Sequence, residues 1–299
     1  MYNTIMDFAN AVADEIKTHS SSFFPSDFVI SSVEINKVVK NNDTEYVGII
    51  IRKEGSNIAP NIYLESCYKD YIDNGVDLHD ICKGIANVRM KSDAPDIDTD
   101  SLDNLDKTRD KILPRLANAK LNAEYLANKP HKFVEDLAVM YIVRLTDDMS
   151  VPITDSLLDR YGITTDELDK IAMDNLAKSE VEFKSMYDVM REMIPEDMWD
   201  ELPPDDGMMH VLTNKSKIYG ASAILDKATM NKIADKLGSG FAIIPSSVHE
   251  VIILKVVDNM DVNDLKSMIG TVNTEQLEAK DILSDHPYIY NKKSGLTSV

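Results

Sequence analysis

The sequence has 299 residues, 43% of them hydrophobic, which is enough to bury one large core or two of ordinary size and excludes a wholly disordered chain. Its net charge of −19 comes without a local Lys/Arg cluster, so we expect neither nucleic acid nor an anionic membrane as a partner. Residues 1–20 lack a basic segment ahead of an apolar run, and no window holds the roughly 20 apolar residues of a membrane span, so we expect a cytoplasmic protein.

The first part of the chain has the pattern of a helix followed by a β-meander and further helices. Phe8, Val12 and Ile16 recur at helical spacing, and Asn41-Asn42-Asp43 has the composition of a hairpin turn. The expected elements are a helix over residues 3–18, strands over residues 28–40, 46–52 and 61–64, and helices over residues 68–72 and 77–89. This order, rather than a βαβ alternation, is typical of an α+β fold.

Cys67 and Cys82 fall in this first part, the second of them inside an amphipathic helix. In a cytoplasmic protein we expect two buried, reduced thiols rather than a disulfide.

Residues 91–107 are polar and acidic, which favours a linker between two α+β subregions, residues 1–107 and 108–299, unless both share one core. Asp96, Asp98 and Asp100 in this segment match the first three ligand positions of a calcium loop. The glycine and the last glutamate of that loop are replaced by Ser101 and Lys107, so we expect a solvated linker and no metal site.

Beyond the linker, the C-terminal part mixes strands and helices. Thr164 and Glu167 have the spacing of a capping box, in which each satisfies a backbone N–H of the other. Residues 188–207 carry eight acidic residues against one basic residue, and we expect a loosely packed connection there, with a second candidate boundary around residues 195–207. The other expected elements are strands over residues 112–117, 137–145 and 288–290 and helices over residues 154–162, 164–176 and 262–272.

Residues 208–254 form the most informative segment, with the pattern strand, turn, strand, helix, strand, turn, strand, in which residues 220–225 supply the second strand. The last turn lies between two strands that are apolar on both faces, where unpaired polar groups are costly. We therefore expect a binding site at this turn. Its expected binding residues are Ser246, Ser247, His249 and Glu250, together with Asn214 at a strand end.

A hydroxyl, an imidazole and a carboxylate are also the parts of a catalytic relay, with Ser247 or Ser222 as nucleophile and His249 as base. In an extended segment the side chains of Ser247 and His249 run parallel, about 7 Å apart, which argues against a relay within the turn. His249 and Glu250 point to opposite faces, so the carboxylate of a relay would have to come from elsewhere. The competing interpretation is a tight turn whose hydroxyls cap backbone groups. A zinc motif fails because Ile253 stands where a second histidine belongs, and no phosphate-binding loop is present, so we expect no cofactor.

Six segments together resemble the bacterial domain of unknown function 5688 family. They are residues 62–65, 135–138, 211–214, 220–225, 244–251 and 283–285. The resemblance implies an α+β fold, a soluble bacterial protein and carriage on mobile elements, but no activity and no catalytic residues.

The function expected from the sequence is that of a non-catalytic interaction or regulatory protein with a protein partner, which uses the turn at residues 246–250 and nearby acidic loops. Two alternatives remain open. One is a hydrolase or transferase built on His249, and the other is an acidic decoy that imitates DNA.

Overall fold

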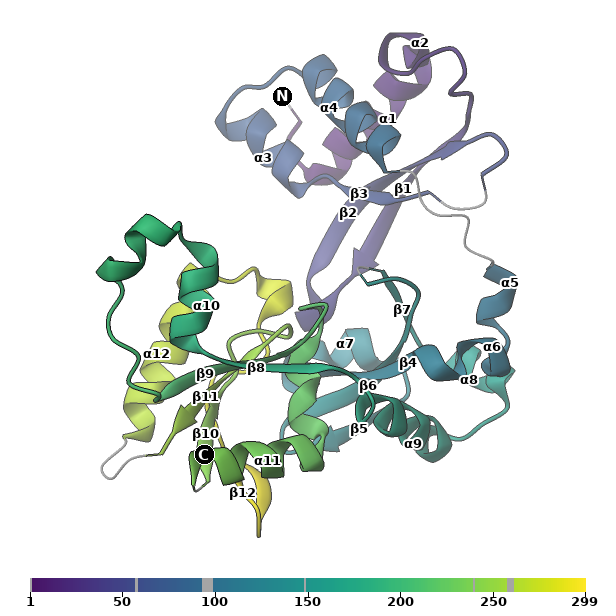
Figure 1. Ribbon diagram of the computed structural model, residues 1–299. Coiled ribbons are helices and arrows are strands. Elements are labelled where there is room, and N and C mark those ends of the chain that lie inside the picture. The colour runs from purple at the N-terminus through teal and green to yellow at the C-terminus, as the bar shows by residue number, and fades with distance from the viewer. Residues whose placement is uncertain (1, 57–58, 93–98, 148, 239, 257–260) are drawn as a thin grey trace. The chain divides into compact units, whose positions relative to one another are not determined.

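A computed structural model describes residues 2–56, 59–92, 99–147, 149–238, 240–256 and 261–299 (Figure 1). The chain divides into two compact units: unit 1 comprises Met1–Lys40 and Thr44–Thr99, and unit 2 comprises Asn41–Asp43 and Asp100–Val299. Each unit combines antiparallel sheet with helices, which confirms the predicted α+β class. Within the described part of the chain, no helix is long and apolar enough to cross a membrane.

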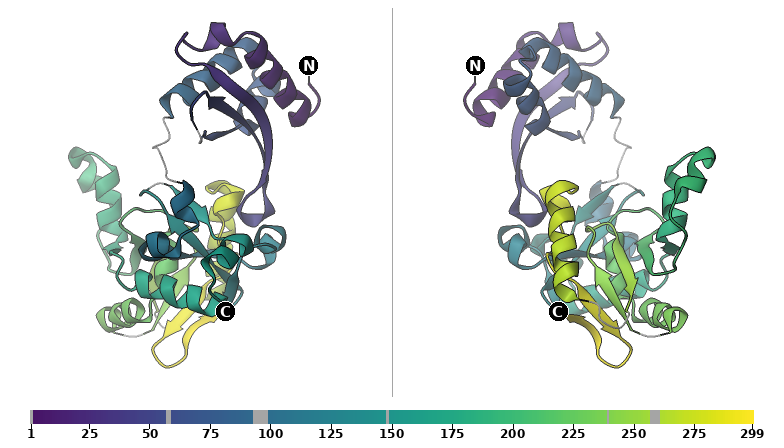
Figure 2. Two further views of the ribbon diagram at one scale, coloured as in Figure 1. Left: turned by 90° about the vertical axis from the view of Figure 1, so that its right-hand side faces the viewer. Right: turned by 90° about the vertical axis from the view of Figure 1, so that its left-hand side faces the viewer.

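Unit 1 has the predicted order of a helix, a three-stranded meander and further helices. Its elements are α1 (Ile5–Thr18), α2 (Ser20–Phe23), β1 (Ile30–Val39), β2 (Glu45–Lys53), β3 (Asn61–Tyr63), α3 (Glu65–Asp73) and α4 (Leu78–Lys91). The helices lie on one face of the sheet (Figure 2), where Phe8 and Ile16 of α1 pack with Ile49 of β2 and Ile85 of α4. Burial of this apolar face supplies the main stabilisation of the unit.

Both cysteines of unit 1 are free thiols, as predicted, but only Cys82 is fully buried; Cys67 is half-buried. Burial raises the pKa of Cys82 to about 12. Because the thiolate is the reactive form, Cys82 is an inert core residue.

Unit 2 contains a four-stranded and a six-stranded sheet, with strand orders β4-β6-β5, where β7 also pairs with β6, and β13-β12-β10-β11-β9-β8. The strands are β4 (Ile112–Asn118), β5 (His131–Val134), β6 (Leu137–Arg144), β7 (Ser150–Pro152), β8 (Val181–Ser185), β9 (Met209–Asn214), β10 (Phe241–Ile244), β11 (Val251–Lys255), β12 (Tyr288–Asn291) and β13 (Gly295–Ser298). The longer helices are α8 (Asp155–Tyr161), α9 (Thr165–Leu176), α10 (Met186–Met193), α11 (Lys227–Leu237) and α12 (Val262–Glu275). The capping box predicted at the start of α9 is present, with both hydrogen bonds formed between Thr164 and Glu167.

Strand β10 is buried on both faces of the six-stranded sheet. Phe241 and Ile243 face a large apolar cluster that includes α9, α11 and the four-stranded sheet, whereas Ile244 packs with Leu265 and Ile269 of α12 on the other face. Such double burial explains why the strand is apolar throughout. Residues 245–250 connect β10 to its antiparallel neighbour β11, so a rigid core holds the turn at both ends.

The prediction of a strand over residues 220–225 was wrong, because Gly220–Leu225 forms a 3-10 helix, η5. Tyr219 adopts a left-handed backbone conformation, with φ of 54°, and turns the chain back toward the end of β9. A short apolar run fits a buried strand and a buried helical turn equally well, so its period did not distinguish them.

Residues 188–207, predicted to be a loosely packed connection, are largely helical. They include most of α10 and a second 3-10 helix, η4 (Glu196–Glu201). The Arg191 guanidinium lies 3.7 Å from the centre of the Trp199 ring, and the Trp199 indole N–H donates to the Arg191 carbonyl over 3.2 Å. A cation–π contact and a hydrogen bond thus order a segment whose acidic composition suggested little packing.

The expected linker also contains helical turns. These are α5 (Thr99–Leu102) and α6 (Leu105–Thr108), and α4 extends to Lys91 before it. Of the three aspartates compared with a calcium loop, Asp96 and Asp98 lie outside the described residues and Asp100 lies in α5. A third short helix, α7 (Ala123–Leu126), precedes β5.

Candidate functional site

The turn at residues 246–250, called the 246–250 turn below, is closed by the Ser247 hydroxyl. Ser247 Oγ accepts hydrogen bonds from the backbone N–H groups of His249 (3.0 Å) and Glu250 (3.3 Å). The Ser247 side chain is 6% exposed, and its neighbour Ser246 is half-buried. Short side-chain hydroxyls commonly satisfy backbone donors two and three residues ahead in this way. Ser247 therefore shapes the turn, and its hydroxyl serves the backbone rather than the imidazole.

Both ring nitrogens of His249 have partners. The backbone N–H of Tyr219 donates to Nδ1 over 3.2 Å, and Nε2 lies 3.3 Å from Oδ1 of Asp281. Because Nδ1 accepts, the proton of the neutral imidazole is on Nε2, from which it is donated to the carboxylate. Asp281 thus supplies the carboxylate that the sequence analysis placed outside the turn.

The imidazole of His249 also belongs to a stack. The Tyr219 ring lies nearly parallel to it, with centroids 5.5 Å apart and an interplanar angle of 14°, and the Arg115 guanidinium lies 4.1 Å from the Tyr219 centroid. Arg115 is buried and donates from Nη1 to the Tyr125 hydroxyl over 3.2 Å. We call Arg115, Tyr219, His249 and Asp281 the His249 cluster. The hydrogen bond from His249 lowers the pKa of the Asp281 carboxyl, to which the charge of Arg115 adds.

Gly220 brings the end of β9, η5 and the 246–250 turn into direct contact. A Cβ at this position would lie 2.2 Å from Thr213 Oγ1 and 2.6 Å from both Asn214 N and His249 O. The Thr213 hydroxyl donates to the same His249 carbonyl over 2.8 Å. Only glycine leaves room for such close packing of backbones. Three of the segments that carry the family resemblance therefore meet at one point.

A pocket of about 420 Å³ lies in unit 2 beside the His249 cluster. Its lining includes Asn214, Tyr219 and Ser222 on one side and Leu113 and Arg144 on the other. We call it the Arg144 pocket. Tyr219 belongs to both the pocket and the His249 cluster, so it connects the two.

The residues expected at one site are therefore divided between two places. Asn214 and Ser222 line the Arg144 pocket, whereas Ser246, Ser247, His249 and Glu250 do not. The Ser222 hydroxyl donates to the Tyr219 carbonyl over 2.8 Å, and an Asn214 amide N–H donates to the Ile218 carbonyl over 2.9 Å. Neither serine hydroxyl is hydrogen-bonded to the imidazole of His249 in the described structure.

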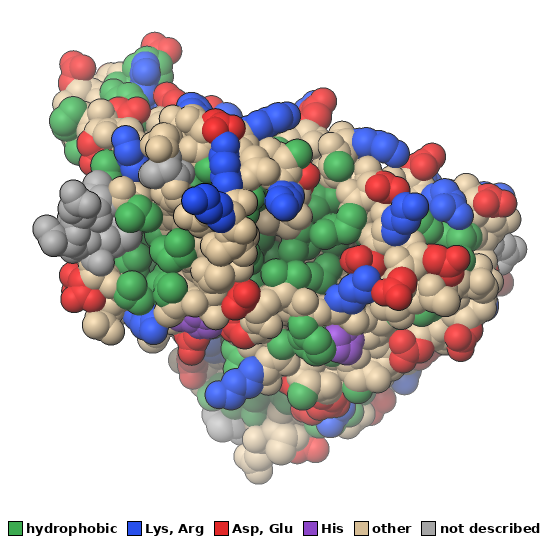
Figure 3. Space-filling view, turned by 90° about the horizontal axis from the view of Figure 1, so that it is seen from below, with side chains coloured by type: hydrophobic (Ala, Val, Ile, Leu, Met, Phe, Trp, Pro, Cys, Tyr) green, Lys and Arg blue, Asp and Glu red, His purple; other side chains and the backbone are tan. Residues whose placement is uncertain are grey.

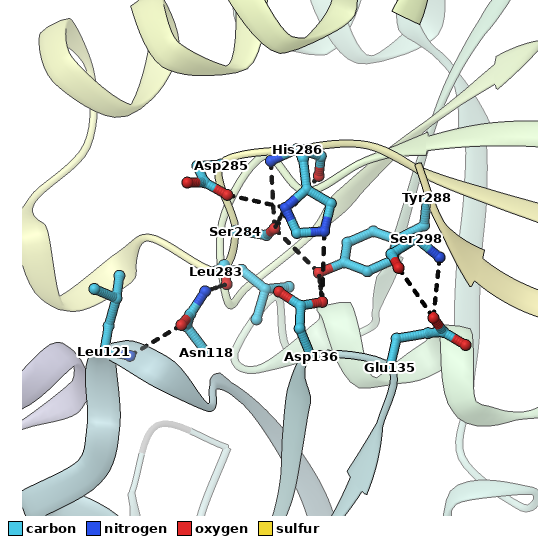
Figure 4. A network of polar contacts seen from close by, with 10 residues as sticks. All are labelled: Asn118, Leu121, Glu135, Asp136, Leu283, Ser284, Asp285, His286, Tyr288 and Ser298. Carbon is cyan, nitrogen blue, oxygen red and sulfur yellow. Dashed lines mark hydrogen bonds and ion pairs between the residues drawn. The ribbon is translucent and has the colours of Figure 1, made fainter.

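A second polar network, which the sequence did not predict, joins the turn between β5 and β6 to residues 284–288 at the start of β12 (Figure 4). The Tyr288 hydroxyl lies 2.7 Å from Asp136 Oδ1 and 3.0 Å from Ser284 Oγ, and His286 contacts both Asp136 (3.5 Å) and Asp285 (2.9 Å). Ser284 Oγ lies 3.2 Å from His286 Nδ1, so the parts of a Ser–His–Asp relay are present. Ser284 is 0% exposed, however, and a nucleophile that no substrate reaches identifies this network as structural.

The only sequence signal for this second network was the family resemblance, because residues 135–138 and 283–285 are two of the six segments that carry that resemblance. Arg144, Tyr219 and Asp281 were also missed. Arg144 had a visible signal, because it is a charged residue at the end of an otherwise apolar strand. Among the described residues, no group of three or more His, Cys, Asp or Glu side chains is arranged to hold a metal ion.

We expect Asp281→Asn to lower the free energy of unfolding at neutral pH by about 1–2 kcal/mol, because the charge-assisted bond to His249 is lost. The folded-state pKa of Asp281 is depressed, so its contribution is present above the ordinary carboxyl pKa of 3.8 and disappears as the pH falls through the lower, folded value. The stability difference between wild type and variant should therefore shrink below about pH 4.

Urea unfolding at neutral and acid pH measures this difference. Asp159→Asn removes an exposed carboxylate from α8 and serves as the control, for which the stability difference should stay small at every pH. The prediction would be contradicted if Asp281→Asn lowered the free energy of unfolding by the same amount at both pH values.

A model of a family of unknown function (DUF5688) matches residues 5–292, which confirms the resemblance over nearly the whole chain. No curated protein and no solved structure matches the chain.

Proposed function

The chain belongs to the family of unknown function DUF5688, and we propose that it is a non-catalytic binding protein whose recognition site is the Arg144 pocket. One observation carries this proposal: both nitrogens of His249 are occupied by Tyr219 and Asp281, whereas Tyr219 itself lines a pocket of about 420 Å³. The interaction role expected from the sequence is retained, but its site moves from the 246–250 turn to the adjoining pocket.

The pocket has the size of a small-molecule site and a mixed polar and apolar lining. Its volume of about 420 Å³ falls within the range of roughly 300–1,000 Å³ that is usual for such sites. Apolar side chains, among them Leu113 and Ile142, share the lining with the polar groups of Asn214 and Ser222. Charged side chains, among them Arg144 and Glu180, also line the pocket, so the wall offers both polar and apolar contacts to a ligand. Tyr219, which the His249 cluster holds, keeps part of this wall in place.

The hydrolase alternative lacks a free base at the turn. A relay on His249 needs one ring nitrogen to accept the proton of a serine hydroxyl, and its Nδ1 already accepts from a backbone N–H. The decoy alternative requires carboxylates in rows at phosphate-like spacing. On the face drawn in Figure 3, Asp and Glu side chains are interspersed with Lys and Arg, which gives a decoy role no support there.

Ligand-detected NMR with a panel of common metabolites tests the proposal. We expect members of the panel to bind the wild type and to be recovered chemically unchanged. Ser216→Trp places a large side chain at the pocket lining and should abolish binding. Ser267→Trp, on the exposed face of α12, is the matched control and should bind as the wild type does.

Two outcomes would contradict the proposal. One is binding that Ser216→Trp leaves intact, because the ligand would then occupy another site. The other is conversion of a bound compound to product with loss of that conversion in Ser222→Ala or His249→Ala, because the site would then be catalytic.

A further inference from the structure

Arg144 is a cation without a partner at the wall of the pocket. Its backbone pairs with Ser150 in the β6–β7 ladder, which fixes where the side chain starts. No hydrogen bond and no ion pair holds its guanidinium within the part of the chain that the structure describes. The other cation of the lining, Lys215, differs in this respect, because it pairs with Glu180 over 2.8 Å.

The environment of Arg144 makes this lack of a partner costly. The side chain is half-buried, and burial lowers the pKa of its guanidinium, while the carboxylate of Asp147 acts on it only through longer-range attraction. An arginine stays charged in spite of such a shift. A charge that is partly removed from water and has no partner destabilises the fold. An anion that paired with this guanidinium would therefore be bound favourably.

We propose that Arg144 binds the carboxylate of a small organic acid that occupies the pocket. This inference rests on the proposed function and names the class of its ligand. A guanidinium presents parallel N–H donors that match the two oxygens of a carboxylate, and such bidentate pairs are among the stronger hydrogen-bonded contacts in proteins. Asn214 and Ser222 also line the pocket, but their polar groups already bond to Ile218, Ser216 and Tyr219, so Arg144 is the group of the lining that we assign to the carboxylate.

The remaining lining favours a monocarboxylate over a phosphate. Asp147 and Glu180 also line the pocket, and their negative charges repel a dianion more strongly than a monoanion. The apolar side chains of Leu113, Ile142 and Val181 offer contact to a hydrocarbon body, which inorganic phosphate lacks. An organic acid with one carboxylate and an apolar body satisfies both conditions.

Titration with four probes tests the inference: hexanoate, its neutral isostere hexanamide, the cation hexylamine, and inorganic phosphate. The methyl resonances of Ile142 and Ala223, both in the lining, report binding in the intact protein. We expect hexanoate to bind at least tenfold more tightly than each of the other three probes. Arg144→Gln should remove the difference between hexanoate and hexanamide.

Two further variants separate the role of Arg144 from general effects. Arg144→Lys keeps the charge but loses the bidentate geometry, so hexanoate affinity should fall between those of the wild type and Arg144→Gln. Arg160→Gln removes an arginine of α8 that pairs with Asp103 outside the pocket, and it should leave hexanoate binding unchanged. The thermal unfolding midpoint of Arg144→Gln should equal or exceed that of the wild type, because an unpaired cation is removed.

The contrary outcomes are distinguishable. Equal binding of hexanoate and hexanamide, or stronger binding of hexylamine or phosphate, would overturn the inference about Arg144 and leave the binding pocket in place. If none of the four probes shifts the Ile142 or Ala223 methyl resonances, both the inference and the proposed function fail.

Discussion

Replacing Gly220 by alanine is expected to lower the free energy of unfolding by about 3 kcal/mol or more, because the added methyl group has no space. Its carbon would lie 2.2 Å from Thr213 Oγ1 and 2.6 Å from the backbone atoms Asn214 N and His249 O. Asn214 is held by its pairing with Val181 of β8, and His249 lies two residues before Val251, where the β9–β11 ladder begins, so neither backbone segment moves without distorting a ladder. Two displaced backbone segments cost more than one displaced side chain, which sets the expected size of the effect.

Urea unfolding of Gly220→Ala beside Gly270→Ala measures this effect. Gly270 lies in α12, and a Cβ there meets nothing within 4 Å. The control should therefore gain up to about 1 kcal/mol from the better helix propensity of alanine. A Gly220→Ala protein as stable as the control would mean that β9, η5 and the 246–250 turn are less closely packed than their distances indicate.

The same contacts explain why residues 220–225 form a 3-10 helix and not the strand that the sequence predicted. The apolar run is buried in either conformation, so its composition did not distinguish a strand from a helical turn. What decides the conformation is long-range: Tyr219 in a left-handed conformation, and Gly220 against Asn214 and His249. The predicted elements that proved right, such as α1 and the capped helix α9, depend on signals within one or two helical turns.

The strands that were missed share a different property. β5, β7, β8 and β13 are short and lie at the edges of their sheets, and each has at least as many half-buried or exposed positions as buried ones. A short strand with little burial shows no clear alternation, and its partner supplies the evidence that it is a strand. The predicted long strand of residues 137–145 shows the converse, since β6 is buried along nearly its whole length.

Like the fold, the candidate site was predictable from the sequence only where its signals are local. Four polar residues between two buried strands marked the 246–250 turn, and the turn does carry the hydrogen bonds that its composition suggested. Its partners Asp281 and Tyr219 lie 32 and 30 residues away in sequence, and no pattern in the sequence joins them to His249. The pocket is a property of the folded sheets, so the sequence shows Arg144 as a charged residue at the end of an apolar strand but does not show that it lines a pocket.

The Tyr288 network illustrates how a polar group becomes part of a core. The side chain is fully buried in the large apolar cluster of unit 2, and burial raises the pKa of its hydroxyl far above the ordinary value. The hydroxyl therefore remains a proton donor, with Asp136 at 2.7 Å and Ser284 at 3.0 Å. Since the apolar ring and the hydroxyl contribute separately, two substitutions at this position resolve them.

We expect Tyr288→Ala to lower the free energy of unfolding by about 4 kcal/mol, because the loss of a large buried ring leaves a cavity and the hydrogen bonds to Asp136 and Ser284 are lost. Tyr288→Phe keeps the ring and should cost about 1–3 kcal/mol, the contribution of the hydroxyl alone. Phe133→Ala is the control: Phe133 is 62% exposed on β5, so its removal should change stability little. Urea unfolding of the three variants measures the differences. If Tyr288→Phe lowered the free energy of unfolding as much as Tyr288→Ala, the hydroxyl network rather than packing would stabilise this part of unit 2. If Tyr288→Phe left the free energy of unfolding unchanged, the hydrogen bonds to Asp136 and Ser284 would contribute nothing to stability.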